Sequence, residues 1–278
     1  YHTLEATGKG LEGWRYRIQI SPLDCTGCNN CVDICPARNK ALEMKPLDEA
    51  LVLEEDNFRF AETLPEPEID IAVNTIRGSQ FRRPLFEYSG ACAGCGETPY
   101  VKLITQLFGE RMLVANATGC SSIYSSNHPT SPYTTNCKGR GPAWGSSLFE
   151  DNAEYGYGYY LGLLQQRKGL VELVQQALSI IGNGSSSPLA EALKHWLQVK
   201  DDGALSLNAA DQIKALLPDT IKSASGTLLE ILQQIEKNSD LLAKRSIWII
   251  GGDGWAYDIG YGGLDHVVST NADINLLV

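Results

Sequence analysis

The chain has 278 residues, of which 43% are hydrophobic and 20% are charged, and its formal net charge is −10. This length accommodates one large domain and one small one, and the composition is that of an ordinary globular protein. The negative charge argues against a nucleic-acid partner, and the sequence shows neither a signal-like start nor an apolar run of ~20 residues, so we expect a cytoplasmic protein without a membrane partner.

Four of the eight cysteines lie near the start of the chain as Cys25-x2-Cys28-x2-Cys31-x3-Cys35-Pro36. In bacterial ferredoxins this spacing gives three thiolates to one 4Fe–4S cluster and the fourth thiolate to a second cluster. A structural zinc site is the alternative, but zinc ligands usually come as two separated pairs. Residues 1–24 contain no cysteine, so either this is a one-cluster variant or the remaining ligands precede Tyr1. We predict a small ferredoxin-like α+β domain over residues 1–57.

A second group of cysteines follows a proline-rich and acidic segment, which we interpret as an exposed linker over residues 58–88. Cys92 and Cys95 form a Cys-x-x-Cys turn with glycines around it, and Cys120 stands just downstream. Glycines let a backbone come close to a bulky inorganic group and leave amides free to face its sulfurs. These three cysteines therefore predict a second iron–sulfur site.

The next predicted elements are a helix over residues 98–109 and a short buried strand over residues 111–116. Cys120 then falls in the loop at the carboxyl end of that strand, where open α/β sheets place their ligands. Residues 119–160 are rich in Gly, Ser, Tyr and Pro, and so long an irregular stretch is usually functional. Cys137 has no cysteine neighbour there, and we interpret it as a free thiol rather than a ligand.

Residues 163–245 differ in character, because apolar side chains recur there at helical spacing. A helix is predicted to start at Ser187-Pro188. His195 and Trp196 lie inside this block, and ordinary helix packing accounts for both. We predict a helical segment that contributes no catalytic or ligand-binding residue.

A further ligand site is predicted at Ile247-Trp-Ile-Ile-Gly-Gly-Asp-Gly-Trp255, where an apolar strand leads into a glycine turn and a helix begins at Trp255. Such a junction presents backbone amides to a diphosphate, and Asp253 could bind Mg²⁺ through oxygen. An ordinary Asp-Gly turn is the alternative. The last residues, 273–278, have the pattern of a buried strand. For residues 89–278 we predict an open parallel α/β sheet with helices on both faces.

Four runs of the chain are long enough to compare with known families: Cys92-Ala-Gly-Cys-Gly-Glu-Thr-Pro-Tyr100, Ala115-Asn-Ala-Thr-Gly-Cys-Ser-Ser122, Gly139-Arg-Gly-Pro-Ala-Trp-Gly145 and Gly251-Gly-Asp-Gly-Trp-Ala-Tyr-Asp-Ile-Gly260. Together with the ferredoxin run they resemble the pyruvate:ferredoxin (flavodoxin) oxidoreductases. The resemblance implies a large multidomain enzyme, usually a homodimer, that oxidatively decarboxylates pyruvate with coenzyme A. Electrons would pass through 4Fe–4S clusters to ferredoxin or flavodoxin. Residues 1–57 would be part of the family's ferredoxin domain, and residues 89–278 most of its thiamine diphosphate-binding domain.

The resemblance also implies roles for single residues. Cys92, Cys95 and Cys120 would ligate the cluster nearest to thiamine diphosphate, and Glu97 and Cys120 would also touch that cofactor. The diphosphate would contact Gly252, Asp253, Gly254 and Trp255, with Asp253 on Mg²⁺. Cys25, Cys28 and Cys31 would hold one ferredoxin-type cluster, and Cys35 would ligate the other.

Several parts expected from the family lie outside this sequence, among them a fourth ligand of the cluster near the thiamine, further Mg²⁺ ligands and the residues that hold pyruvate. The chain also has no initiator Met, so we expect an internal piece of a longer polypeptide that does not turn over pyruvate alone. A relative acting on another 2-oxoacid is one alternative. A non-catalytic iron–sulfur electron-transfer protein and a zinc-stabilised module are two others; the first would not bind thiamine diphosphate with Mg²⁺, and the second would be colourless.

Overall fold

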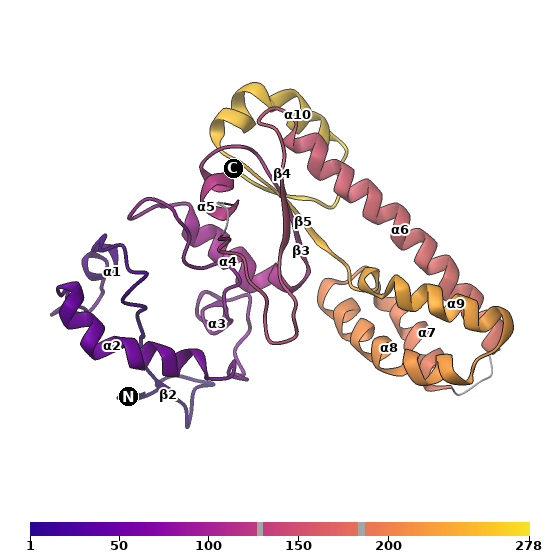
Figure 1. Ribbon diagram of the computed structural model, residues 1–278, viewed down its shortest axis with the longest axis horizontal. Coiled ribbons are helices and arrows are strands. Elements are labelled where there is room, and N and C mark those ends of the chain that lie inside the picture. The colour runs from indigo at the N-terminus through magenta and orange to yellow at the C-terminus, as the bar shows by residue number, and fades with distance from the viewer. Residues whose placement is uncertain (127–129, 183–186) are drawn as a thin grey trace. The chain divides into compact units, whose positions relative to one another are not determined.

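A computed structural model describes residues 1–126, 130–182 and 187–278 (Figure 1). The chain divides into two compact units, the first formed by residues 1–109 and 124–138 and the second by residues 110–123 and 139–278. The first unit therefore contains the ferredoxin run, the segment expected to be a linker and the Cys-x-x-Cys turn together.

The start of the first unit has almost no apolar core. Strands β1 (Leu4–Glu5) and β2 (Arg15–Tyr16) pair antiparallel, and three helices follow: α1 (Asn30–Asp33), α2 (Leu47–Glu62) and α3 (Ile76–Ser79). The structure describes every residue from Glu12 to Arg77, and Pro22 is the only buried one in that stretch. So little burial supplies almost no hydrophobic driving force, which small domains commonly replace with a bound metal.

The compact part of the first unit forms around α4 (Thr98–Phe108), which confirms the helix predicted at this place. Its buried face carries Val101 and Ile104, and Gly109 follows as the C-cap. A Cβ atom on Gly109 would lie 2.8 Å from Leu85 Cδ1, so the segment before the cysteine turn packs closely against the end of this helix. That packing shows that the predicted linker is partly buried near its carboxyl end.

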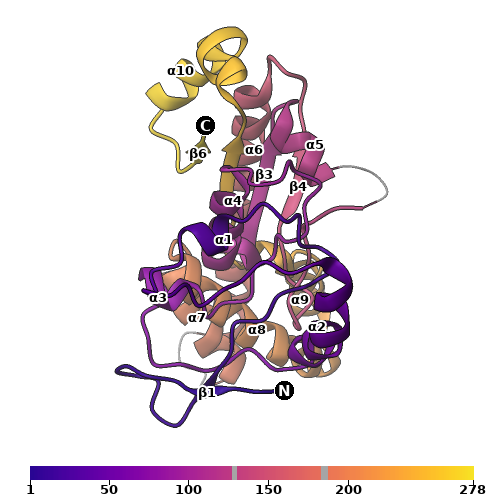
Figure 2. The same cartoon turned by 90° about the vertical axis from the view of Figure 1, so that its left-hand side faces the viewer.

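The second unit is built on a parallel four-stranded sheet of order β4-β3-β5-β6. The strands are β3 (Met112–Asn116), β4 (Ala143–Ser146), β5 (Ser246–Ile250) and β6 (Asn275–Leu277). Asn116 pairs with Ser146 on one side and with Ile250 on the other, and the three strands lie side by side in Figure 2. The predicted α/β class with a parallel sheet is confirmed, and so are the strands predicted before Cys120 and before Gly251.

Two strands differ from expectation. Strand β4 was not predicted, because Ala143-Trp-Gly-Ser146 shows no alternation of apolar and polar residues. Strand β6 was predicted as a buried core strand, but it occupies an edge of the sheet, and its residues are partly exposed. An edge strand is covered on fewer sides, so an apolar sequence there does not guarantee burial.

The 30-residue helix α6 (Asn152–Ile181) belongs to two separate cores. Near its start, Ala153 packs with Ala115, Ile249 and Trp255 against the sheet. Its later turns enter a helical block whose other members are α7 (Pro188–Val199), α8 (Gly203–Ser223) and α9 (Gly226–Lys237), as Figure 1 shows. The helix predicted to start at Ser187-Pro188 is α7.

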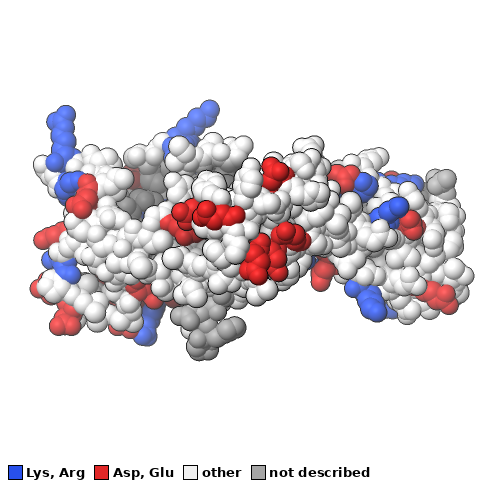
Figure 3. All heavy atoms as spheres, turned by 90° about the horizontal axis from the view of Figure 1, so that it is seen from above, with Lys and Arg blue, Asp and Glu red and all other residues white. Residues whose placement is uncertain are grey.

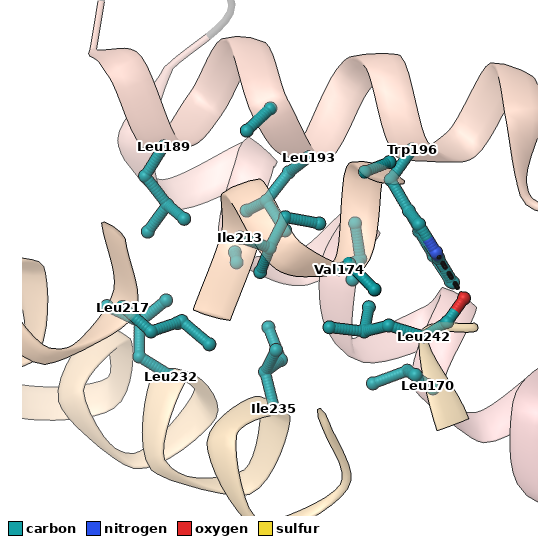
Figure 4. Close-up of a cluster of buried hydrophobic side chains, with 14 of the residues drawn as sticks. Leu170, Val174, Leu189, Leu193, Trp196, Ile213, Leu217, Leu232, Ile235 and Leu242 are labelled. Carbon is teal, nitrogen blue, oxygen red and sulfur yellow. Dashed lines mark hydrogen bonds between the residues drawn. The ribbon is translucent and has the colours of Figure 1, made fainter. Parts of the chain in front are cut away.

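The helical block has its own hydrophobic core, drawn in Figure 4. Trp196 is fully buried in this core, and its Nε1 donates a 2.8 Å hydrogen bond to the carbonyl of Leu242. The packing role predicted for Trp196 is confirmed, whereas His195 is exposed. The Arg167 guanidinium closes the block near the sheet by donating to the carbonyls of Leu241, at 2.5 Å, and Lys200, at 2.6 Å.

The chain returns from the block through a 3-10 turn (Ser239–Leu241) to β5, as it enters β3 from a similar turn (Gly109–Arg111). After β5 a π-helical turn (Gly254–Ile259) precedes α10 (Tyr261–Ser269), so the regular helix predicted from Trp255 begins later than expected. Within the ranges that the structure describes, none of the helices has the length and apolar character needed to cross a membrane.

Candidate functional site

The carboxyl ends of β3, β4 and β5 lie together along one side of the sheet, because the strands are parallel and in register. This carboxyl edge is distinct from the outer strands β4 and β6. Residues 117–120 leave this edge after β3, Ser147 follows β4, and the Gly251–Gly254 loop follows β5. In open α/β sheets ligands bind outside this edge. The topology thus brings the Cys120 and Asp253 loops, far apart in sequence, to the same side of the second unit.

The glycine loop after β5 is packed tightly on one side and open on the other. A Cβ atom on Gly251 would lie 2.6 Å from Trp255 Cε3 and 2.8 Å from Ala117 Cβ, whereas one on Gly252 would meet nothing within 4 Å. Gly251 therefore serves packing, and Gly252 leaves open space beside the backbone. This fits a loop that receives a bulky diphosphate.

Asp253 and Trp255 are placed very differently within this loop. Asp253 is exposed and makes no side-chain cap of the following turn, so its carboxylate can reach a metal ion from open space. Trp255 is fully buried, with its indole against Gly251 and Gly260. The structure thus gives Trp255 a packing role that shapes the loop.

The face shown in Figure 3 carries a group of acidic side chains near its middle.

Cys120 is the first residue of α5 (Cys120–Ser126) and is exposed, where a loop position was predicted. Hydroxyl groups fix the turn before it. Ser121 Oγ donates to Asn116 Oδ1 at 2.9 Å, and the amide of Gly119 donates to Ser122 Oγ at 2.9 Å. The exposed thiol therefore stands on a rigid turn, which suits a metal ligand.

The Cys-x-x-Cys turn lies in the first unit. The amide of Cys95 donates to the carbonyl of Cys92 at 3.0 Å, and Gly94 adopts a φ of 72°, which favours glycine. A Cβ atom on Gly94 would lie 3.3 Å from Asn30 Nδ2 and 3.7 Å from Cys28 Cβ. Within this unit the turn thus approaches the loop that carries the ferredoxin run, as an electron path between two clusters would require.

Glu97 follows this turn after Gly96 and is the N-cap residue of α4. Burial, and then the Glu97 carboxylate, raise the pKa of both Tyr124 and Tyr133. Phe86 supports the two tyrosines in edge-to-face contacts, with ring centroids 5.9 Å from Tyr124 and 5.1 Å from Tyr133. Glu97 therefore lies near both tyrosines, and its charge, together with their burial, keeps both phenol groups protonated.

All cysteines of the ferredoxin run are free thiols; Cys25, Cys28 and Cys31 are exposed and Cys35 is half-buried. The amide of Ala41 donates to Cys35 Sγ at 3.2 Å, and this bond, with a second one from the amide of Ala37, lowers the pKa of the Cys35 thiol. A stabilised thiolate is the form that ligates iron. Residues around this loop thus fit an iron–sulfur cluster.

Among the described residues, no three His, Cys, Asp or Glu side chains converge into a metal-binding group. Cys92 and Cys95 lie in the first unit and Cys120 in the second. Cys137 is exposed, and its interpretation as a free thiol rather than a ligand stays a prediction.

Sequence reasoning missed the polar residues behind the sheet edge. Asn152 is fully buried, and its side chain bonds to the carbonyl of Ile250 and to the hydroxyl of Ser147. The Ser147 hydroxyl also lies within hydrogen-bond distance of the carbonyl of Asn116. In the sequence Asn152 ends the polar run Glu150-Asp-Asn152 before a helix, which is the pattern of an ordinary helix start. Only the three-dimensional structure shows that this residue reaches a distant strand.

Comparison with known proteins agrees with these observations. A family model described as the insertion domain of pyruvate-ferredoxin oxidoreductase matches residues 166–224, and one for a 4Fe-4S binding domain matches residues 18–38. The chain therefore carries a 4Fe–4S binding segment at the ferredoxin run. The insertion-domain model thus matches most of the helical block, for which the sequence predicts no chemistry, and ends before α9.

Three curated relatives align with nearly the whole chain. It is 56% identical over 276 residues to a pyruvate:ferredoxin oxidoreductase of Moorella thermoacetica and 48% identical over 275 residues to a pyruvate-flavodoxin oxidoreductase of Klebsiella pneumoniae, in each case over 99% of this chain and 23% of the relative. It is 43% identical over 298 aligned residues to a pyruvate dehydrogenase [NADP(+)] of Cryptosporidium parvum, over 98% of this chain and 15% of the relative. The chain thus spans less than a quarter of the length of these relatives. Across that span it belongs to the family of pyruvate:ferredoxin and pyruvate:flavodoxin oxidoreductases.

Proposed function

We propose that this chain supplies iron–sulfur and thiamine-binding segments of an oxidoreductase that oxidatively decarboxylates pyruvate with coenzyme A to acetyl-CoA and CO₂. The observation that carries the proposal is the 56% identity to a pyruvate:ferredoxin oxidoreductase over 99% of this chain. The sheet edge supports it, because one unit presents both an open glycine loop with an exposed carboxylate at Asp253 and an exposed thiol at Cys120.

The division of labour follows from what each group can do. Bound thiamine diphosphate supplies the carbanion chemistry at the keto carbon of the 2-oxoacid. Asp253 would hold Mg²⁺, Gly252 leaves the diphosphate room beside the loop, and Gly254 would contact the diphosphate. Trp255 keeps that loop in shape from below. Glu97 would contact the cofactor from the first unit.

The cysteines would hold the electron-carrying clusters. Cys92, Cys95 and Cys120 would ligate the cluster nearest to the thiamine. Cys25, Cys28 and Cys31 would ligate a second cluster and Cys35 a third, from which electrons would leave to ferredoxin or flavodoxin. The names of the relatives support both acceptors. A homodimer of the full-length enzyme and a cytoplasmic location belong to the same proposal.

The test uses the full-length oxidoreductase that contains this sequence, purified without oxygen. We expect pyruvate and coenzyme A together to drive reduction of added ferredoxin or flavodoxin, with release of CO₂. Replacement of Cys120 by Ala should stop that electron flow and leave the ferredoxin-type clusters intact by electron paramagnetic resonance. Normal acceptor reduction by the Cys120→Ala enzyme would contradict the assignment of Cys120.

Two rival functions are tested with the same preparation. A higher kcat/KM with a longer or acidic 2-oxoacid than with pyruvate would identify a relative with another substrate. An enzyme that transfers electrons between iron–sulfur partners but binds no thiamine diphosphate in the presence of Mg²⁺ would be an electron-transfer protein without catalysis.

A further inference from the structure

Asn152, the first residue of α6, joins two strands through its side chain. Its Nδ2 donates to the carbonyl of Ile250 at 3.0 Å, and its Oδ1 accepts from Ser147 Oγ at 3.0 Å. Ile250 is the last residue of β5, and Ser147 directly follows β4. The residue is fully buried, and its amide has a partner at the oxygen and at the nitrogen, as a buried amide requires. The Ser147 hydroxyl also lies 2.7 Å from the carbonyl of Leu148, which competes for its single proton.

The same two partners connect to β3, which lies between β4 and β5. The carbonyl of Ile250 also accepts from the amide of Ala117 at 2.8 Å, and the amide of Ser147 donates to the carbonyl of Asn116 at 2.9 Å. Thr118 Oγ1 donates to the carbonyl of Ser147 at 3.0 Å. One side chain thus stands at the centre of a network that ties the carboxyl ends of three strands together.

Both candidate loops begin at this network. Ile250 is followed at once by Gly251 and the Asp253 loop, and Ala117 and Thr118 lead to Cys120. Gly251 has no room to absorb a shift, because a Cβ there already meets Trp255 and Ala117. A displacement of the Ile250 carbonyl would therefore pass directly into the loop that carries Asp253.

Helix α6 is itself fixed against the sheet at this point. A Cβ atom on Gly156, just over one turn after Asn152, would lie 2.6 Å from Ile249 Cδ1. The backbone of α6 thus lies close against β5, the strand whose last carbonyl accepts from Asn152. If Asn152 served packing alone, an apolar side chain of similar shape would avoid the cost of burying an amide.

We propose that Asn152 is a positioning residue that sets the diphosphate loop at Asp253 relative to the Cys120 loop. It acts through its hydrogen bonds to the Ile250 carbonyl and to Ser147 Oγ. The proposal rests on the proposed function, since it assigns thiamine diphosphate and Mg²⁺ to this edge of the sheet. Asn152 does not itself touch the cofactor.

The test measures binding of thiamine diphosphate with Mg²⁺ to the full-length oxidoreductase, by fluorescence quenching, beside the thermal midpoint of each variant. Asn152→Leu keeps the branched shape of the side chain and removes both hydrogen bonds. We expect its Kd for thiamine diphosphate to rise at least about tenfold, as is typical when a group that supports a metal ligand is lost. Ser147→Ala is the milder variant, with a rise of roughly threefold for the loss of one hydrogen bond.

Trp196→Phe is the matched control. It also loses one buried hydrogen bond, to the Leu242 carbonyl in the helical block, so its thermal midpoint should fall while its Kd for thiamine diphosphate stays unchanged. An unchanged Kd in both Asn152→Leu and Ser147→Ala would overturn the proposal, and so would an equal rise in Trp196→Phe. If Asn152→Leu does not fold, Ser147→Ala decides alone.

The parent enzyme separates this proposal from the one on which it rests. A parent that binds no thiamine diphosphate would overturn the proposed function and the role of Asn152 with it. A parent that binds the cofactor, beside variants that bind it equally well, would overturn the role of Asn152 alone.

Discussion

Replacement of glycines in α6 by alanine should have opposite effects at two positions of the same helix. Gly156 faces the sheet, where an added Cβ would lie 2.6 Å from Ile249 Cδ1 and 3.3 Å from Ala115 Cβ. Gly162 is exposed, and a Cβ there would meet nothing within 4 Å. Both substitutions gain helix propensity, by about 1 kcal/mol relative to glycine.

The difference comes from the clash at Gly156. Ile249 is fully buried and β-branched, so it cannot turn away without moving its neighbours. Overpacking of this kind costs about 1–3 kcal/mol, which exceeds the helix gain. We expect Gly156→Ala to lower the free energy of unfolding by about 1 kcal/mol and Gly162→Ala to raise it by up to about 1 kcal/mol.

Urea denaturation followed by far-ultraviolet circular dichroism measures both variants beside the parent. The comparison within one helix cancels effects on the unfolded chain, because both changes remove the same backbone freedom. If Gly156→Ala proves as stable as Gly162→Ala, then α6 does not lie against β5 as closely as described, and the argument on Asn152 loses its support.

Three further predictions follow from the first unit and the helical block. Because backbone amide bonds lower the pKa of Cys35, its thiolate persists to lower pH in the folded chain; the visible absorbance of the iron-loaded protein should therefore be lost at a higher pH after Ala41→Pro, which removes the amide that donates to Cys35 Sγ, and equal pH midpoints would contradict that bond. Chelation of iron should unfold residues 12–77 and leave α6 intact, because that segment buries almost nothing; hydrogen exchange of its amides measures this, and unchanged protection would refute it. Trp196→Ala should lower the free energy of unfolding by about 3–5 kcal/mol, as expected for a large buried aromatic, and a loss below about 1 kcal/mol would mean that the block is loosely packed.

Elements with strong local patterns could be predicted from the sequence. Helix α4 has a proline in its first turn and glycine at its end, and β5 is a run of apolar residues stopped by two glycines. These cues act between neighbours in the chain, so they can be seen without the fold. The same holds for the ferredoxin run, whose cysteine spacing is itself the chemical evidence.

The remaining features depend on contacts between distant residues. Strand β4 forms because β3 offers it a parallel edge, although Ala143-Trp-Gly-Ser146 has weak strand character. Asn152 gains its role from the carbonyl of Ile250, 98 positions further along the chain. The indole of Trp255 fills the core beneath the loop, so the diphosphate contact that the resemblance implies would be made by its backbone amide. No local pattern distinguishes such roles.

The two cores of α6 bear on how much length variation this segment tolerates. The helical block leaves the sheet along α6 and returns to β5, and Arg167 ties the two ends together through the carbonyls of Leu241 and Lys200. An insertion or deletion in the helical block, on the far side of the Arg167 hydrogen bonds from the sheet, would leave the pairing of β3 with β5 in place. This requires that the first turns of α6 keep their contacts with Ile249. Insertions and deletions should therefore be tolerated in the block and selected against in the turns that carry Asn152 and Gly156.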